Sequence, residues 1–149
     1  LILDSALKIM GTRGYGLMID HGIETARLFA DEIKKRDMYQ LVTAPALNIL
    51  TYRMVPSALQ SMLEATETGK REEINQTLDQ LNIMIQRRQR EAGKSFVSRT
   101  RLKIRPDDTT ESVVLRSVIM NPMTHIGIIN EILDEQELIF DHVKPLFNL

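Results

Sequence analysis

The sequence predicts an α+β fold in which a small, mostly antiparallel β-sheet is covered by helices on one face. Three observations predict this class. Apolar residues recur at helical spacing in several segments, shorter segments have the patterning of strands, and no internal repeat is present. A chain of 149 residues, of which 43% are hydrophobic and 26% charged, is long enough for one domain with a buried core.

Two helices are predicted in the first 36 residues. A short opening helix ends near residue 10, because Gly11-Thr12-Arg13-Gly14 interrupts its apolar pattern. A longer amphipathic helix runs from Gly16 to about Arg36 and carries one apolar stripe. The stripe consists of Ile19, Ile23, Ala26, Ala30 and Ile33. We interpret Lys34-Lys35-Arg36 as a structural helix terminus and not as a phosphate site, because cations suit the negative end of the helix dipole.

A strand and a loose connection follow. Leu41-Val42-Thr43 and, after a break at Pro45, the segment from Leu47 to Val55 have the composition of a strand bounded by turn formers. Residues 57 to 70 lack a clear period, so they are predicted to form a connection with some helical turn between Leu59 and Leu63.

A helix and a half-exposed strand are predicted next. Apolar residues from Ile74 to Ile85 return to helical spacing, and Gly93 stops this helix. Residues 96 to 104 then alternate with a period of two, which is typical of a strand with one exposed face. Pro106-Asp107-Asp108 turns the chain.

The last part of the chain predicts an inner strand and a helix. Residues 112 to 120 are apolar on both faces except at Arg116 and Ser117, which indicates a covered strand. Thr124 is predicted to cap a final helix that carries apolar residues from Ile128 to Ile139. The predicted order is therefore α, α, β, α, β, β, α.

Composition disfavours several classes of partner. The net charge of −1 gives no general attraction to nucleic acid or to an anionic membrane, and no apolar run is as long as a membrane span. The basic run Arg87-Arg88-Gln89-Arg90 has no interleaved aromatic residues, so a solvated helix face is favoured over base stacking. The absence of cysteine excludes disulfides and thiolate metal sites and fits the cytoplasm. The start at Leu1, with no initiator methionine, leads us to expect a piece of a longer protein.

No complete active site is visible. The three histidines, His21, His125 and His142, are scattered without metal-ligand spacing, and we expect them to be surface or hydrogen-bonded residues. The glycines from Gly11 to Gly16 follow no strand, so they fit neither a P-loop nor a dinucleotide loop. The acidic residues of the last helix are interpreted as a solvated face. They are Glu131, Asp134, Glu135 and Glu137.

Arg116 is the candidate functional residue. It interrupts a strand whose neighbours favour burial, and a buried guanidinium needs an anion to compensate its charge. The anion could be an internal carboxylate, or the side chain could extend over a sheet edge into solvent. These ordinary explanations are slightly favoured over ligand binding on physical grounds alone.

The chain resembles a known family at both ends. Leu115-Arg116-Ser117-Val118-Ile119-Met120-Asn121-Pro122, followed by Thr124 and an acidic-apolar helix, is similar to the C-terminal strand and helix of the pyridoxal-phosphate-dependent group II amino acid decarboxylases, of the glutamate and L-2,4-diaminobutyrate type. Leu3 to Lys8, the turn from Gly11 to Gly16 and the strand from Asn48 to Pro56 resemble that family's passage from its large to its small domain. The resemblance covers residues 1 to 56 and 94 to 142 and is weak from 57 to 93.

The resemblance implies a fold type I enzyme whose cofactor-binding lysine, histidine and aspartate lie in an upstream large domain, so this chain contains no catalytic, cofactor-binding or metal residue. Lys8, Lys34 and Lys94 do not lie in the family's lysine motif. Arg116 matches the arginine that binds the substrate α-carboxylate. The resemblance also implies a small amino acid substrate, pyridoxal 5′-phosphate and a homodimer for the full-length protein.

The resulting expectation is the C-terminal domain of a cytoplasmic carboxy-lyase. Residues 1–15 would form the link from the large domain, and residues 16–149 would form the small domain. The chain alone is expected to be inactive, with the apolar face of Leu3, Leu7 and Met10 uncovered. Two alternatives stay open: an autonomous α+β interaction or regulatory domain without catalysis, and the small domain of a fold type I aminotransferase.

Overall fold

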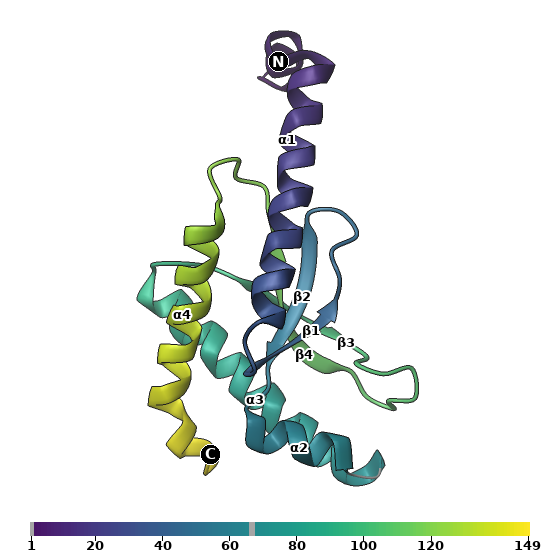
Figure 1. The fold of residues 1–149 in the computed structure, drawn as a ribbon, viewed down its shortest axis with the longest axis vertical. Helices are drawn as coiled ribbons and strands as arrows, with labels where there is room; N and C mark the ends of the chain where they lie inside the picture. Colours follow the sequence, from purple (N-terminus) through teal and green to yellow (C-terminus); the bar gives the residue numbers. More distant parts are fainter. Residues whose placement is uncertain (1, 66–67) are drawn as a thin grey trace.

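The computed structural model describes residues 2–65 and 68–149. It confirms the α+β class, because helices pack on a four-stranded antiparallel sheet with strand order β1-β2-β4-β3. The elements in chain order are α1 (Ile2–Lys34), β1 (Tyr39–Thr43), β2 (Ile49–Met54), α2 (Ser57–Ala65), α3 (Thr68–Ala92), β3 (Ser98–Leu102), β4 (Ser112–Val118), α4 (Ile126–Val143) and a 3-10 turn (Lys144–Phe147). The strand predicted as covered, β4, is an inner strand of the sheet (Figure 1).

Helix α1 contains the break that the sequence predicts. Gly11 has φ 61° and ψ 178°, which lies outside the helical region and in a region that glycine tolerates best. The predicted turn is shorter than expected, because residues 12–15 already belong to the second helical segment. The division into residues 1–15 and 16–149 stays a prediction.

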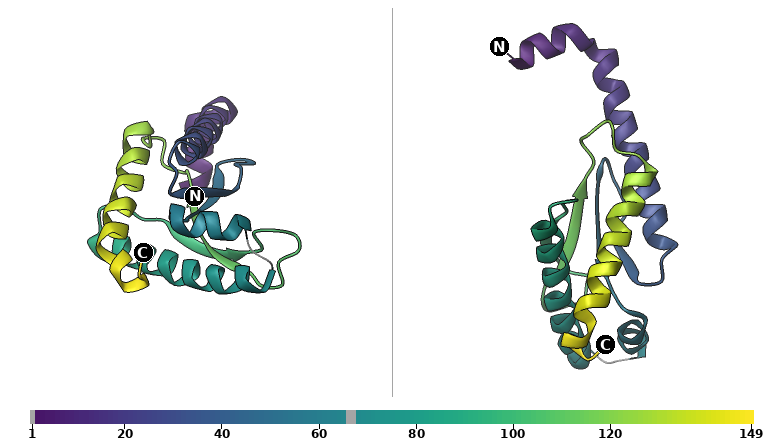
Figure 2. Two further views of the ribbon diagram at one scale, coloured as in Figure 1. Left: turned by 60° about the horizontal axis from the view of Figure 1, so that its bottom comes forward. Right: turned by 90° about the vertical axis from the view of Figure 1, so that its left-hand side faces the viewer.

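The first half of α1 extends beyond the rest of the domain, as Figures 1 and 2 show. Leu7 and Met10 are exposed, as expected, whereas the side chain of Leu3 lies outside the described residues. The predicted stripe packs only in its second half, since Ile19 is 57% exposed but Ile33 is fully buried.

Residues 39–54 form a hairpin of two strands where the sequence predicts one. Tyr39 is opposite Met54, and the side-chain hydroxyls of Thr43 and Thr51 are 2.7 Å apart across the pair. The predicted connection over residues 57–70 is also wrong in part. It contains α2, which buries Leu59 and Leu63 one turn apart, and the beginning of α3.

The core lies between one face of the sheet and helices α1, α3 and α4. The sheet contributes Leu50, Tyr52 and Leu115, and the ring of Phe29 in α1 lies 5.5 Å from that of Tyr52. In the right-hand view of Figure 2, α4 lies in front of the strands, with α3 on one side and α1 on the other. The hydroxyl of Tyr39 donates to the carbonyl of Leu133 at 3.0 Å, so its buried polar atom is satisfied.

A buried polar chain crosses this core. Gln136 of α4 donates from Nε2 to the Tyr52 hydroxyl at 3.1 Å and to Oε1 of Gln89 in α3 at 3.0 Å. All three residues are fully buried. Burial raises the pKa of Tyr52 to about 12. The chain therefore ties two helices to the centre of the sheet through groups that water does not reach.

Helix α4 is fixed at its start and along its side. The prediction that Thr124 caps it is wrong by one residue, because Nδ1 of His125 accepts from the backbone N–H of Gly127 at 3.1 Å. Arg36, at the end of the first helix, donates to Asp134 at 2.7 Å and to Glu137 at 2.8 Å. The structural interpretation of the Lys34–Arg36 cluster is thereby supported. The solvated face predicted for the acidic residues is wrong in part, because Asp134, Glu135 and Glu137 have protein partners, Glu135 accepting from the hydroxyl of Ser95.

Candidate functional site

The position of Arg116 follows from the register of β4. Arg116 lies opposite Thr51 of β2 and Ser98 of β3, on the face of the sheet that bears Ile49 and Val118. Its neighbour Leu115 lies on the other face, in the core cluster under the helices. Since successive side chains of a strand point to opposite faces, Arg116 is exposed in spite of its apolar sequence neighbours. The burial suggested by those neighbours is therefore wrong for the side chain itself.

Among the described residues, the guanidinium of Arg116 forms a hydrogen bond through one of its nitrogens. Its Nε donates to Oγ of Ser98 at 3.1 Å, and the same hydroxyl donates to the carbonyl of Arg116 at 2.9 Å. Within residues 2–65 and 68–149 no carboxylate forms an ion pair with it. The terminal nitrogens are therefore oriented by a neutral anchor and can donate to an anion in the paired geometry that arginine offers.

A hollow of about 420 Å³ lies beside this arginine, where β3 begins and β4 ends. Phe29, Phe96 and Ile132 supply apolar walls, and Asn121 and Thr124 add polar groups. Arg116 is one of its lining residues. An apolar hollow with one cation at its boundary can accept a small organic anion, with the carboxylate toward the cation.

The other residues considered from the sequence do not join Arg116. Lys8 pairs with Asp4 at 2.8 Å and Lys34 with Asp31 at 3.2 Å, both on exposed helix surfaces. Each histidine makes a local contact within its own segment, as expected. The described part of the chain contains no group of three or more metal-ligating side chains and no helix that is long and apolar enough to cross a membrane.

Sequence reasoning missed Arg53, which is 2% exposed in β2. It lies in an apolar strand, as Arg116 does, so the criterion that selected Arg116 also applied to it. Arg53 donates from Nε to Oε1 of Gln40 at 2.7 Å and from Nη1 to Oδ1 of Asn75 at 2.8 Å. Of these two arginines, the one that the sequence analysis passed over is the buried one.

Comparison with known proteins defines a class for this domain. No protein-family model matches the chain. The chain is 41% identical over 151 residues to an aspartate 1-decarboxylase of Aliivibrio fischeri, a match that covers 99% of the chain and 28% of the relative. It is 28% identical over 119 residues to an aromatic-L-amino-acid decarboxylase of Bacillus atrophaeus, covering 80% of the chain and 21% of the relative. The chain thus spans about a quarter of the length of these curated relatives.

Solved structures share the fold. The apo structure of mouse CSAD matches with a TM-score of 0.76 and 24% identity over 92% of this chain and 26% of its own. The glutamate decarboxylase domain of a diaminobutyrate-pyruvate transaminase and L-2,4-diaminobutyrate decarboxylase from Vibrio parahaemolyticus matches at 0.69 with 18% identity, covering 92% and 24%. The domain has the fold of a part of these decarboxylases. Its resemblance to the C-terminal small domain of the group II pyridoxal-phosphate-dependent decarboxylases is confirmed.

Proposed function

We propose that this chain is the C-terminal domain of a pyridoxal-phosphate-dependent amino acid decarboxylase and that Arg116 binds the α-carboxylate of the substrate. The observation that carries the proposal is the exposed guanidinium of Arg116, anchored at Nε by Ser98 and free of any carboxylate in the described chain. The similarity to decarboxylases over nearly the whole chain supports the reaction class.

We place the cofactor outside this chain, because Lys8, Lys34 and Lys94 do not lie in the lysine motif of the family. The cofactor and its chemistry would therefore belong to the upstream large domain. This chain would help to bind and orient the substrate. A bidentate contact from Arg116 would fix the direction of the α-carboxylate, and hence that of the bond to be cleaved.

The substrate proposed first is L-aspartate. It rests on the 41% identity to a protein named as an aspartate 1-decarboxylase, which exceeds the identity to the other relatives reported above. Glutamate and L-2,4-diaminobutyrate are the comparison substrates, because the sequence resemblance points to enzymes that act on them. An upstream large domain, a second copy in a homodimer and a cytoplasmic location complete the proposal.

The open face of the sheet supports an upstream partner. Ile49 and Val118 lie opposite each other beside Arg116 and are 45% and 36% exposed, on the face away from helices α1, α3 and α4. An apolar pair next to a cation is a suitable surface to close over a substrate bound on another domain.

The test has two stages. The reading frame before Leu1 should encode several hundred further residues with a cofactor lysine; a frame without them would refute the decarboxylase assignment. In that longer protein, Arg116→Lys keeps the charge but loses the paired donors, so kcat/KM for L-aspartate should fall roughly 10- to 150-fold. The cofactor absorbance should be unchanged.

The matched control is Arg99→Lys, an exposed arginine on the neighbouring strand whose side chain lies on the helix-covered face and donates to Gln86. It should retain kcat/KM within about twofold. An Arg116→Lys variant with activity equal to that of the control would show that Arg116 does not bind the carboxylate.

A further inference from the structure

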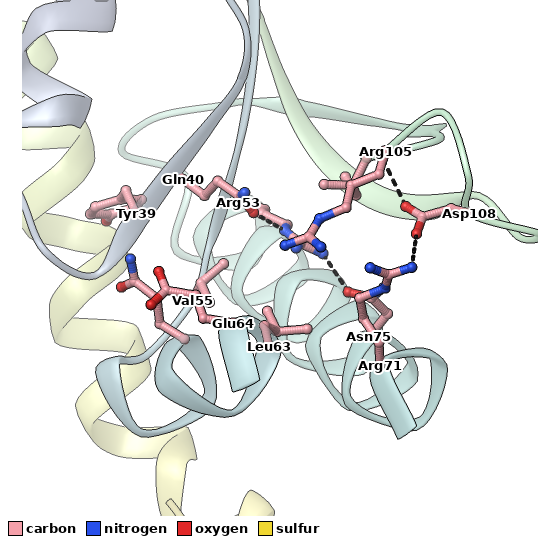
Figure 3. Close-up of a pocket in the computed structure, with 12 residues that line it drawn as sticks. Tyr39, Gln40, Arg53, Val55, Leu63, Glu64, Arg71, Asn75, Arg105 and Asp108 are labelled. Atoms are coloured by element: carbon pink, nitrogen blue, oxygen red, sulfur yellow. Dashed lines mark hydrogen bonds and ion pairs between the residues drawn. The ribbon is translucent and has the colours of Figure 1, made fainter. Parts of the chain in front are cut away.

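A cluster of arginines lies at the opposite end of the sheet from the Arg116 hollow. A pocket of about 130 Å³ is bounded by the end of the β1–β2 hairpin, by α2 and α3, and by the segment between β3 and β4 (Figure 3). Arg53, Arg71 and Arg105 line it from β2, α3 and that segment. The volume has room for a small polyatomic ion with water but not for a large metabolite.

Arg53 supplies a buried charge without a carboxylate partner. Its two described hydrogen bonds go to the neutral amide oxygens of Gln40 and Asn75, and no ion pair reaches it from the described residues. Burial lowers the pKa of Arg53 to about 10; Asp79 and Asp108 oppose this effect, and the charge of Arg105 adds to it. A charge buried in this way is costly unless an anion compensates it.

Arg71 has an unsatisfied donor at the same pocket. It is 7% exposed, and its Nη2 donates to Asp107 at 2.8 Å and lies 3.6 Å from Asp108. Its Nε is buried and has no hydrogen-bond partner in the described structure. A buried N–H without an acceptor calls for an acceptor that the chain itself does not provide.

Arg105 completes the cluster from the rim. Its backbone N–H donates to Asp108 at 2.8 Å, which fixes the start of the loop, while its exposed side chain forms no ion pair in the described residues. Figure 3 shows the three arginine side chains approaching the pocket from separate elements. Two acidic residues, Glu64 and Asp108, also line the pocket, and Asp107 pairs with Arg71 from outside the lining, so the three arginines are matched by three carboxylates, none of which forms an ion pair with Arg53 or Arg105 among the described residues.

We propose that this pocket binds a small free oxyanion of the phosphate or sulfate type. Several oxygens on one compact centre can accept from Arg53, Arg105 and the Nε of Arg71 at once, and they compensate the buried charge. The site is independent of the decarboxylase assignment, because it shares no residue with the Arg116 hollow.

The experiment is calorimetric titration of the purified protein with inorganic phosphate, sulfate and a phosphate monoester at constant ionic strength. Phosphate or sulfate should bind at one saturable site, and the unfolding temperature should rise with the logarithm of the ion concentration above the dissociation constant. Because Arg105 is exposed, Arg105→Gln should fold normally. It should raise the dissociation constant at least roughly tenfold, which is the effect of losing one hydrogen bond between charged groups.

The control is Arg99→Gln, which removes the same charge from an exposed position outside the pocket and should leave the affinity within about twofold. Equal affinities in the two variants, or no saturable binding of phosphate and sulfate to the unsubstituted protein, would overturn the site. Binding of the monoester as tight as that of phosphate would overturn the assignment to a free ion. Activity of the longer protein has no part in this readout, so failure of either proposal leaves the other standing.

Discussion

The buried polar chain through Tyr52 offers a stringent test of the core. Tyr52→Phe removes one hydroxyl while keeping the ring that packs against Phe29. The hydroxyl accepts from Nε2 of Gln136 at 3.1 Å, at positions that water does not reach. Its loss leaves a buried amide N–H short of one acceptor, which costs about 1–3 kcal/mol. For a domain of this size, about 2 kcal/mol corresponds to a fall in Tm of roughly 4–8 °C.

A double-mutant cycle separates the lost bond from the lost atoms. Gln136→Leu removes the amide but leaves Oε1 of Gln89 without that donor, so it is also expected to destabilise the protein. In the combined variant the penalty at Tyr52 disappears, because the donor that needed its hydroxyl is gone. The two effects should therefore be less than additive by about 1 kcal/mol or more.

Urea unfolding followed by circular dichroism measures the free energy of unfolding of the unsubstituted protein, the two single variants and the double variant. The slope with denaturant should be the same for each protein, since the surface exposed on unfolding changes little. Strictly additive effects, with a coupling below about 0.3 kcal/mol, would show that Tyr52 and Gln136 do not interact in the folded protein and would refute the arrangement of α4 on the sheet.

Two further predictions concern pH and the α1 kink. Burial raises the pKa of both Tyr39 and Tyr52, the latter to about 12, so the neutral phenols stabilise the fold fully below about pH 10. Above that value the free energy of unfolding should fall by up to about 1.4 kcal/mol per pH unit per tyrosine. Tyr52→Phe should make the dependence of this free energy on pH less steep. An unchanged dependence would contradict the burial of Tyr52. Gly11→Ala should disfavour the kinked backbone by about 1–3 kcal/mol and raise helix content or fray residues 2–10, as NMR chemical shifts would report. Gly16→Ala, at a helical position with open space around the new methyl, is the control and should leave the kink unchanged.

The helices and the inner strand could be predicted because their patterns are local. The period of 3.6 residues from Ile74 to Ile85 and the apolar run of β4 are properties of neighbouring residues, and packing kept both. The hairpin was missed because Tyr39 and Gln40 precede the segment considered as a strand, and pairing across the turn decides their conformation. Strand pairs depend on partners distant in sequence, which a local pattern does not contain.

The two arginines in strands show that a local sequence pattern is also insufficient to predict the functional site. Arg53 and Arg116 both interrupt apolar strands, and both lie on the face away from the core cluster. What separates them is the surroundings at each end of the sheet. Asn75 of α3 and Gln40 of β1 accept hydrogen bonds from Arg53, whereas the described residues give the side chain of Arg116 a single hydrogen bond, to the hydroxyl of Ser98. Their burial is therefore set by tertiary neighbours.

The extended part of α1 also sets the distance and the rotation about the helix axis between the residues before Gly11 and the rest of the domain. From Gly11 to the first core residues the helix makes little contact with the rest of the domain, so its length is free of packing constraints there. At about 1.5 Å and 100° per residue, insertion of seven residues would move the preceding segment outward by about 10 Å and rotate it by only about 20°. Insertion of two residues would add about 3 Å but turn it by roughly 200°, to the opposite side of the axis. Insertions and deletions in this segment should therefore be tolerated in near-heptad steps wherever the residues before Gly11 must face a fixed surface.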